Sequence, residues 1–178
     1  MLRLEVAPGE YFDERSLTFV SSPGAVVRLE HSLASLSKWE SITHRSLLKE
    51  TDLSGEDLLL YLECMCLDDP PSRDVLTRLV LQHSREVGAY MTDRQSATWF
   101  HESGNGSAGD TVTAEIIYYQ MVALRIPFEC QYWHLNRLLA LIRTCQVKSE
   151  SGRKEVSRSE FAAQKARARE LYRRGRLG

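Results

Sequence analysis

The sequence predicts an α+β fold that is mainly α, in which a small N-terminal antiparallel β-element packs on a helical bundle with a central αα-hairpin. Residues 2–6 alternate between apolar and charged side chains, as in a half-buried strand, whereas from Ser32 onward several segments have apolar residues every three or four positions, as in amphipathic helices. The 178 residues are 43% hydrophobic and 26% charged, which is typical of one globular domain. We assign that domain to residues 1–145 and a C-terminal tail to residues 146–178.

The β-element is expected to be a small antiparallel hairpin or meander. Residues 2–6 (LRLEV) alternate between apolar and charged side chains, and the Pro8-Gly9 pair ends this strand. Two further short apolar runs, residues 17–20 and 25–29, lie on either side of a turn and predict the second and third strands.

Local capping signals place the first helices. Ser32 is a candidate N-cap for a helix whose apolar residues recur at three-residue spacing. Ser54, followed by two acidic residues, begins a second helix that two consecutive prolines terminate. Residues 72–82 predict a further helix and residues 85–90 a short one, and the glycine- and serine-rich residues 101–109 predict a surface loop.

The strongest helical signals follow that loop. Thr111 or Thr113 caps a helix that is apolar around most of its surface, so we expect it to lie in the centre of the core. Ile126-Pro127 ends this helix, and a second runs from about Glu129 to Cys145. The two form the predicted αα-hairpin. The second helix carries a single apolar stripe made of Leu135, Leu138, Leu139, Ile142 and Cys145.

The sequence contains no recognised catalytic or metal-binding pattern. Phosphate-binding, dinucleotide-binding and nucleophile-elbow motifs are missing, and the five histidines lack metal-ligand spacing. His31 and His134 are expected to have structural partners in the core, and the four cysteines to be reduced core residues. We therefore predict no catalytic residue, no cofactor, no metal and no enzymatic activity. A secretory signal and an uncharged run of about 18 residues are also lacking, so no membrane association is expected.

Two features suggest protein-protein contacts. Trp133 and Arg137 are projected away from the apolar stripe of their helix, and both residue types are enriched at interface hot spots. The alternative for Trp133 is that the β-element or the preceding helix covers it. In the tail, the large apolar side chains are Phe161, Leu171 and Tyr172, too few to fold it onto the body, so we expect a partly helical segment that orders on a partner chain.

The net charge of −1 combines two opposite parts. Residues 146–178 hold ten lysines and arginines against four carboxylates, a net charge of +6, whereas residues 1–145 hold thirteen against twenty, a net charge of −7. A basic tail can neutralise phosphates. Its interspersed glutamates and its few aromatic residues favour a solvated or partner-docked helix instead, so nucleic-acid binding is not expected.

Two stretches of the chain resemble proteins encoded in the structural gene clusters of tailed bacteriophages and commonly taken for tail assembly chaperones. They are residues 29–41 (LEHSLASLSKWES) and residues 113–145 (TAEIIYYQMVALRIPFECQYWHLNRLLALIRTC). The N-terminal strands and the tail resemble this family in layout, while residues 42–50 and 70–86 depart from it.

The resemblance implies a viral chaperone that binds and solubilises the tape-measure protein while tail-tube subunits assemble on it. It implies as partners the tape-measure protein or tail-tube subunits, with a homo-oligomer as a further possibility, and the host cytoplasm as the place of assembly. The alternative is a structural virion protein at the head-tail connector or in the tail, which would stay in the particle.

Overall fold

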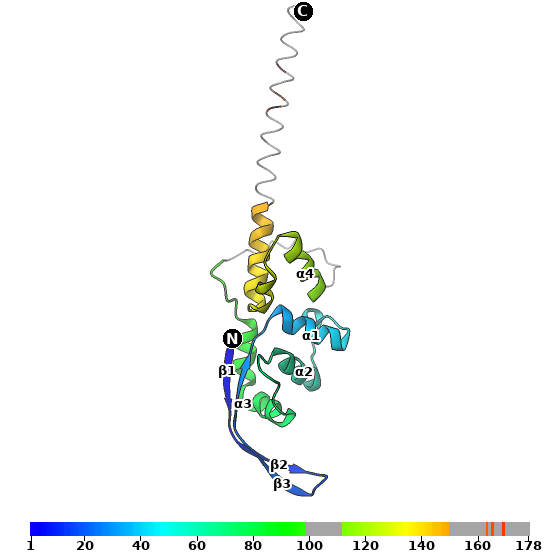
Figure 1. Cartoon of the computed structure of the whole chain (residues 1–178), viewed down its shortest axis with the longest axis vertical. Coiled ribbons are helices and arrows are strands. Elements are labelled where there is room, and N and C mark those ends of the chain that lie inside the picture. The colour runs from blue at the N-terminus through cyan, green and yellow to red at the C-terminus, as the bar shows by residue number, and fades with distance from the viewer. Residues whose placement is uncertain (99–111, 150–162, 164, 166–168, 170–178) are drawn as a thin grey trace, which may run out of the picture. The chain divides into compact units, whose positions relative to one another are not determined.

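The computed structural model describes residues 1–98 and 112–149, together with positions 163, 165 and 169 (Figure 1). The chain divides into two compact units, Met1–Ala140 and Leu141–Gly178. The fold is α+β and mainly helical, with antiparallel strands confined to the N-terminal region of the described chain, as the sequence predicts. The expected domain boundary after residue 145 stays a prediction.

The N-terminal residues form one long antiparallel hairpin that is interrupted on both sides. Its strands are β1 (Leu2–Val6), β2 (Gly9–Asp13), β3 (Thr18–Ser22) and β4 (Ala25–Leu29). β1 pairs with β4, and β2 pairs with β3. The sequence interpretation missed β2, because the Pro8-Gly9 pair was taken as the end of the β-structure on that side. The chain resumes the extended conformation after Pro8, since β3 supplies a partner strand there.

The β1–β4 pair packs on the helices through one face. Leu4 and Val6 of β1, and Val27 and Leu29 of β4, are buried, while the residues between them face outward. β1 contacts α3 (Arg73–Thr92). This alternation confirms the predicted half-buried strands.

The helices begin where the capping residues predicted. Ser32 Oγ accepts a hydrogen bond from Ser35 N at 3.2 Å and begins α1 (Leu33–Thr43). Ser54 begins α2 (Gly55–Met65) with a capping box, in which Ser54 Oγ accepts from Asp57 N and the Asp57 carboxylate accepts from Ser54 N. The two helices predicted over residues 72–82 and 85–90 join into α3 through a kink at His83, whose backbone is non-helical.

The second half of the described chain contains α4 (Ala114–Ala123), the 3-10 helix η2 (Phe128–Tyr132) and a helix over residues 135–149. The expected start of this last helix at Glu129 is wrong, because residues 128–132 form a separate 3-10 turn that follows Pro127. Within the predicted apolar stripe, Leu135, Leu138 and Ile142 are buried, whereas Leu139 and Cys145 are half-buried.

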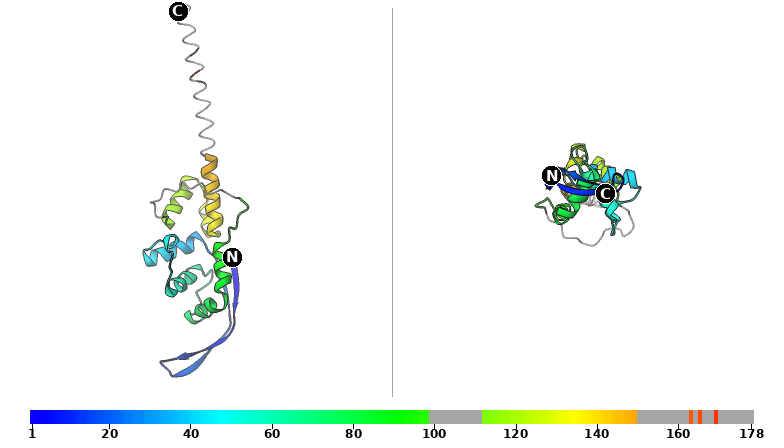
Figure 2. Two further views of the ribbon diagram at one scale, coloured as in Figure 1. Left: turned by 180° about the vertical axis from the view of Figure 1, so that it is seen from behind. Right: turned by 90° about the horizontal axis from the view of Figure 1, so that it is seen from below.

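The core is built around α1. Leu33, Leu36 and Trp39 on this helix are completely buried. α1 contacts α2, α4, η2 and the short 3-10 helix η1 (Leu47–Lys49). Figure 2 shows the same elements from behind and from below.

Candidate functional site

An exposed apolar surface lies on α4 and η2. Its members are large apolar side chains with exposed fractions between 38% and 71%, and we call them the α4–η2 face: Ile116, Tyr119, Val122, Phe128 and Tyr132. The buried side of α4 consists of Ala114, Ile117 and Met121. The expectation that this helix lies in the centre of the core is therefore wrong, because only one side of α4 is buried. Apolar composition alone does not distinguish a fully buried helix from a half-buried helix that presents its other side to a partner.

Tyr118 connects the two parts of this face. Its ring stacks on the ring of Phe128, with centroids 6.2 Å apart and an interplanar angle of 30°. Its hydroxyl donates a hydrogen bond to Gln131 Oε1 at 2.7 Å. Burial raises the pKa of Tyr118, and nearby Tyr132 raises it further. These contacts hold η2 against α4, so the exposed apolar residues of the face lie on two elements that touch each other.

A tight chain reversal brings η2 back against α4. The amide of Ile126 donates to the carbonyl of Met121 at 2.8 Å, and that of Arg125 donates to Val122 at 3.1 Å. Arg125 has a φ of 55°, in the left-handed region that follows many helix ends. Pro127 then begins η2, where a missing amide hydrogen costs no hydrogen bond.

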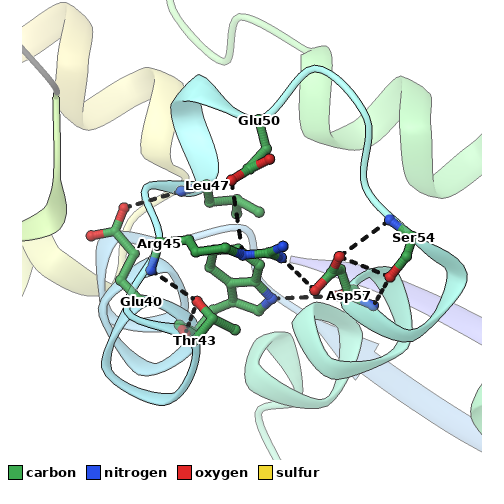
Figure 3. Close-up of polar contacts among 8 residues, drawn as sticks. Glu40, Thr43, Arg45, Leu47, Glu50, Ser54 and Asp57 are labelled. Atoms are coloured by element: carbon green, nitrogen blue, oxygen red, sulfur yellow. Dashed lines mark hydrogen bonds and ion pairs between the residues drawn. The ribbon is translucent and has the colours of Figure 1, made fainter.

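Glu40 of α1 determines where α4 begins. Thr113 occupies the N-cap position of α4 without a side-chain hydrogen bond to the helix. The buried carboxylate of Glu40 supplies the missing acceptor, because its Oε2 accepts a hydrogen bond from Ala114 N at 2.7 Å (Figure 3). Its other oxygen, Oε1, accepts from Leu47 N at 3.3 Å. Burial raises the pKa of Glu40, and the two backbone donors oppose that rise. A carboxylate at a helix N-terminus is also favoured by the helix dipole.

A second polar network holds the loop between α1 and α2. Arg45 contacts the carboxylates of Asp57 and Glu50 (Figure 3), and its guanidinium lies 5.2 Å from the ring centroid of Trp39. Trp39 Nε1 donates to the carbonyl of Asp57 at 3.3 Å. The hydrogen bonds from Arg45 and Ser54 lower the pKa of Asp57 to about 2. The network fixes the α1 end that carries Glu40.

Of the predicted interface residues, the structure describes Trp133 and Arg137 but not those of the tail. Trp133 is half-buried at the end of η2, and the guanidinium of Arg137 lies over its ring at 4.2 Å from the centroid. The structure thus brings these two side chains together in a cation–π contact. Their role in an interface stays a prediction. Phe161, Leu171 and Tyr172 lie outside the described residues.

A buried polar cluster joins the end of β4 to α2, α3 and the start of the last helix. His31 Nδ1 lies 2.6 Å from the hydroxyl of Tyr61, and the rings of His31 and His134 meet edge to face at 5.3 Å. His134 donates from Nε2 to the carbonyl of Tyr90 at 3.0 Å, and the Tyr90 hydroxyl donates to the carboxylate of Glu30. Both histidines are buried and hydrogen bonded, which confirms the structural partners expected for them.

Burial and the neighbouring His134 lower the pKa of His31 to about 4, although Glu30 opposes the shift. Burial also raises the pKa of Tyr61 and Tyr90. In each case the uncharged form is favoured at neutral pH. A backbone bond from Leu135 N to the His31 carbonyl at 2.7 Å completes the connection. Inside the core, this cluster therefore connects the end of β4 to α2, α3 and the start of the last helix through hydrogen bonds.

The thiols lie in or near the core. All four cysteines are free, with Cys64 and Cys130 buried and Cys66 and Cys145 half-buried. Burial raises the pKa of Cys64, and it raises that of Cys66 to about 11, so these two thiols are protonated at neutral pH. Over residues 1–98 and 112–149 no group of three or more His, Cys, Asp or Glu is arranged to hold a metal ion.

The described helices include none with the length and apolar character needed to cross a membrane. Comparisons of the chain with protein-family models, with curated proteins and with solved structures find no match.

Proposed function

We propose that this chain is a phage tail assembly chaperone that binds and solubilises the tape-measure protein through the α4–η2 face. The observation that carries the proposal is the position of this face. All five of its residues fall within residues 113–145, the longer of the two stretches that resemble the family. The stretch that resembles the chaperones thus exposes several apolar and aromatic side chains on two neighbouring elements.

The chemistry of the face suits a helical client. Tyrosine and phenylalanine supply large contact areas with few rotatable bonds, and two of the five residues are tyrosines. An amphipathic helix binds by laying its apolar stripe against such a surface. The tape-measure protein, which is the client implied by the resemblance, is long and helical. Before assembly it would expose apolar stripes of this kind.

The face is also held in place before any client arrives. Glu40 fixes the first turn of α4, and Tyr118 couples α4 to η2. A preorganised surface loses less conformational entropy on binding than a mobile one does. This supports a binding role that needs no catalytic group.

Co-expression with the tape-measure protein of the same phage tests the proposal. The wild-type chain should increase the soluble fraction of the tape-measure protein, and the double variant Tyr119→Ser/Val122→Ser should not. Leu81→Ser is the matched control, because Leu81 is 79% exposed on α3, outside the α4–η2 face. Equal solubilisation by the double variant and the control would reject the α4–η2 face as the client site.

The alternative, a structural protein of the head-tail connector or tail, differs in its final location. A chaperone leaves the assembled tail, so mass spectrometry of purified particles should not detect this chain. Its presence at a stoichiometric, ring-like copy number would replace the chaperone proposal by the structural one.

A further inference from the structure

The β2–β3 pair forms an arm that reaches beyond the helices (Figures 1 and 2). We call residues 9–22 the β2–β3 arm. In the described part of the chain neither strand pairs with a third strand, so each has an open edge. A two-stranded hairpin without further packing is only marginally stable in water. An arm of this kind therefore gains stability when another strand joins it.

The base of the arm is firmly attached to α3. Arg78 donates to Ser22 Oγ at 2.6 Å, to the Pro23 carbonyl at 3.3 Å and to the Ala7 carbonyl. Gln82 Oε1 accepts from Ala7 N at 3.0 Å. Gly9 makes room for Arg78, because a Cβ at that position would lie 2.9 Å from Arg78 Cδ. These contacts bridge both interruptions of the hairpin, so the direction of the arm is fixed at its base.

The tip of the arm contains an apolar residue in a strained conformation. Asp13 accepts hydrogen bonds from Arg15 N at 3.1 Å and from Ser16 Oγ at 2.7 Å, which orders the turn. Leu17 ends the turn with a φ of 51° and is 74% exposed. Glycine or asparagine adopts this conformation at lower cost, and a leucine that is 74% exposed buries little of its apolar surface in the monomer. A contact with another chain would account for a leucine at this position.

One face of the arm is aromatic. Phe12 and Phe19 are cross-strand partners, and their rings meet edge to face at 5.3 Å. Both are exposed, Phe19 to 74%. A cross-strand aromatic pair of this kind continues favourably into a third strand that places another aromatic ring beside it.

The two open edges differ in charge. β2 carries Glu10 and Asp13, whereas β3 (TFVSS) contains no charged residue. When identical strands pair antiparallel about a twofold axis, the residue on the axis faces its own counterpart, and each other residue faces the one equally far on the opposite side of the axis. Such pairing through β2 would bring carboxylates together, while pairing through β3 brings no like charges together. Natural edge strands are commonly protected from self-pairing by charged residues, and β3 lacks this protection.

We propose that β3 pairs antiparallel with β3 of a second copy of this chain, so that two arms form one four-stranded sheet. Phe19 lies on the twofold axis opposite its own counterpart, and Thr18 lies opposite Val20. Phe12 and Phe19 of both copies then form a continuous row of four rings on one face. Leu17 immediately precedes β3, so the two exposed leucines lie at the ends of the new strand pair, and the acidic β2 strands occupy the outer edges. This dimer does not depend on the client-binding role of the α4–η2 face.

Sedimentation of the full chain tests the proposal. The wild-type protein should form a dimer as its concentration rises. Phe19→Lys and Phe19→Glu should each remain monomeric at concentrations where the wild type is dimeric, because like charges would meet on the axis. An equimolar mixture of the two variants should dimerise again, because the lysine and the glutamate then face each other. The control Leu81→Lys, an equally exposed apolar position on α3, should dimerise like the wild type.

Hydrogen exchange of the wild-type protein gives an independent measurement that requires no variant. Raising the concentration through the dimer transition should slow the exchange of amides within residues 17–21 selectively. A wild-type chain that stays monomeric throughout would overturn the proposal. So would dimers that persist in Phe19→Lys, a variant mixture that does not recover dimerisation, or concentration-dependent protection confined to other elements.

Discussion

Replacing Glu40 by alanine should destabilise the protein and release the first turn of α4. The carboxylate accepts hydrogen bonds from two backbone amides, those of Ala114 and Leu47, at 2.7 and 3.3 Å. Alanine would leave both amides without this acceptor, and leaving a buried donor unsatisfied costs about 1–3 kcal/mol. Burial disfavours the carboxylate itself, as the raised pKa of Glu40 indicates, and this offsets part of the loss.

We expect Glu40→Ala to lower the free energy of unfolding by about 2–4 kcal/mol, after this offset. Glu40→Gln should cost less, about 0–2 kcal/mol, because the amide keeps one acceptor oxygen and removes a buried charge. Glu63→Ala is the control, since Glu63 is exposed on α2, and such surface changes are usually within about 0.5 kcal/mol.

Urea unfolding followed by circular dichroism gives the three free energies, and hydrogen exchange reports on the first turn of α4. The Ala114 amide should exchange faster in Glu40→Ala than in the wild type, and co-expressed tape-measure protein should be less soluble with this variant. A Glu40→Ala protein that unfolds like Glu63→Ala, with unchanged protection of Ala114, would refute the capping role of Glu40.

Three further predictions concern the core, the pH dependence and the tail. Leu138→Ala should lower the free energy of unfolding, measured in urea, by about 2–5 kcal/mol, and Leu139→Ala should lower it clearly less, because Leu138 is fully buried and Leu139 only half-buried. Equal losses of stability in the two variants would contradict this. The His31 pKa of about 4, against 6.5 for an ordinary histidine, means that the unfolded chain takes up a proton first, so stability should fall by up to about 3 kcal/mol as the pH drops from about 6.5 to 4. His31→Gln should flatten that part of a pH series of urea midpoints, and an unchanged slope would assign it to other groups. Truncation after Ser149 should leave the melting temperature in calorimetry nearly unchanged while weakening self-association or client binding; a large drop would place the tail in the core.

The mutation series would also separate the two proposed surfaces. Phe19→Lys should abolish dimerisation and leave solubilisation of the tape-measure protein intact, whereas Tyr119→Ser/Val122→Ser should do the reverse. The two surfaces belong to different elements, β3 and α4, and each variant changes only exposed side chains.

Local chemistry made part of this fold predictable. The caps at Ser32 and Ser54 satisfy amides within three residues of themselves, so their effect is visible in a short stretch of sequence. The alternation in β1 and β4 likewise reports burial on one face. The four-residue spacing of Trp133 and Arg137 predicted that the two side chains lie on the same side of the chain, and the structure places them in contact. Trp133, however, precedes the last helix rather than lying within it.

The sequence by itself determined the α+β class, the starts of α1 and α2, and the buried stripe through Leu135 and Leu138, because these depend on contacts between near neighbours or on simple periodicity. Tertiary structure alone decided which side of α4 is exposed, since that depends on what α1 covers. It also decided the role of Glu40, whose partner Ala114 lies 74 residues away. β2 exists because β3 pairs with it across a turn, and a proline-glycine pair in isolation gives no sign of that partner. Contacts between distant residues carry no local signature, and both proposed binding surfaces depend on such contacts.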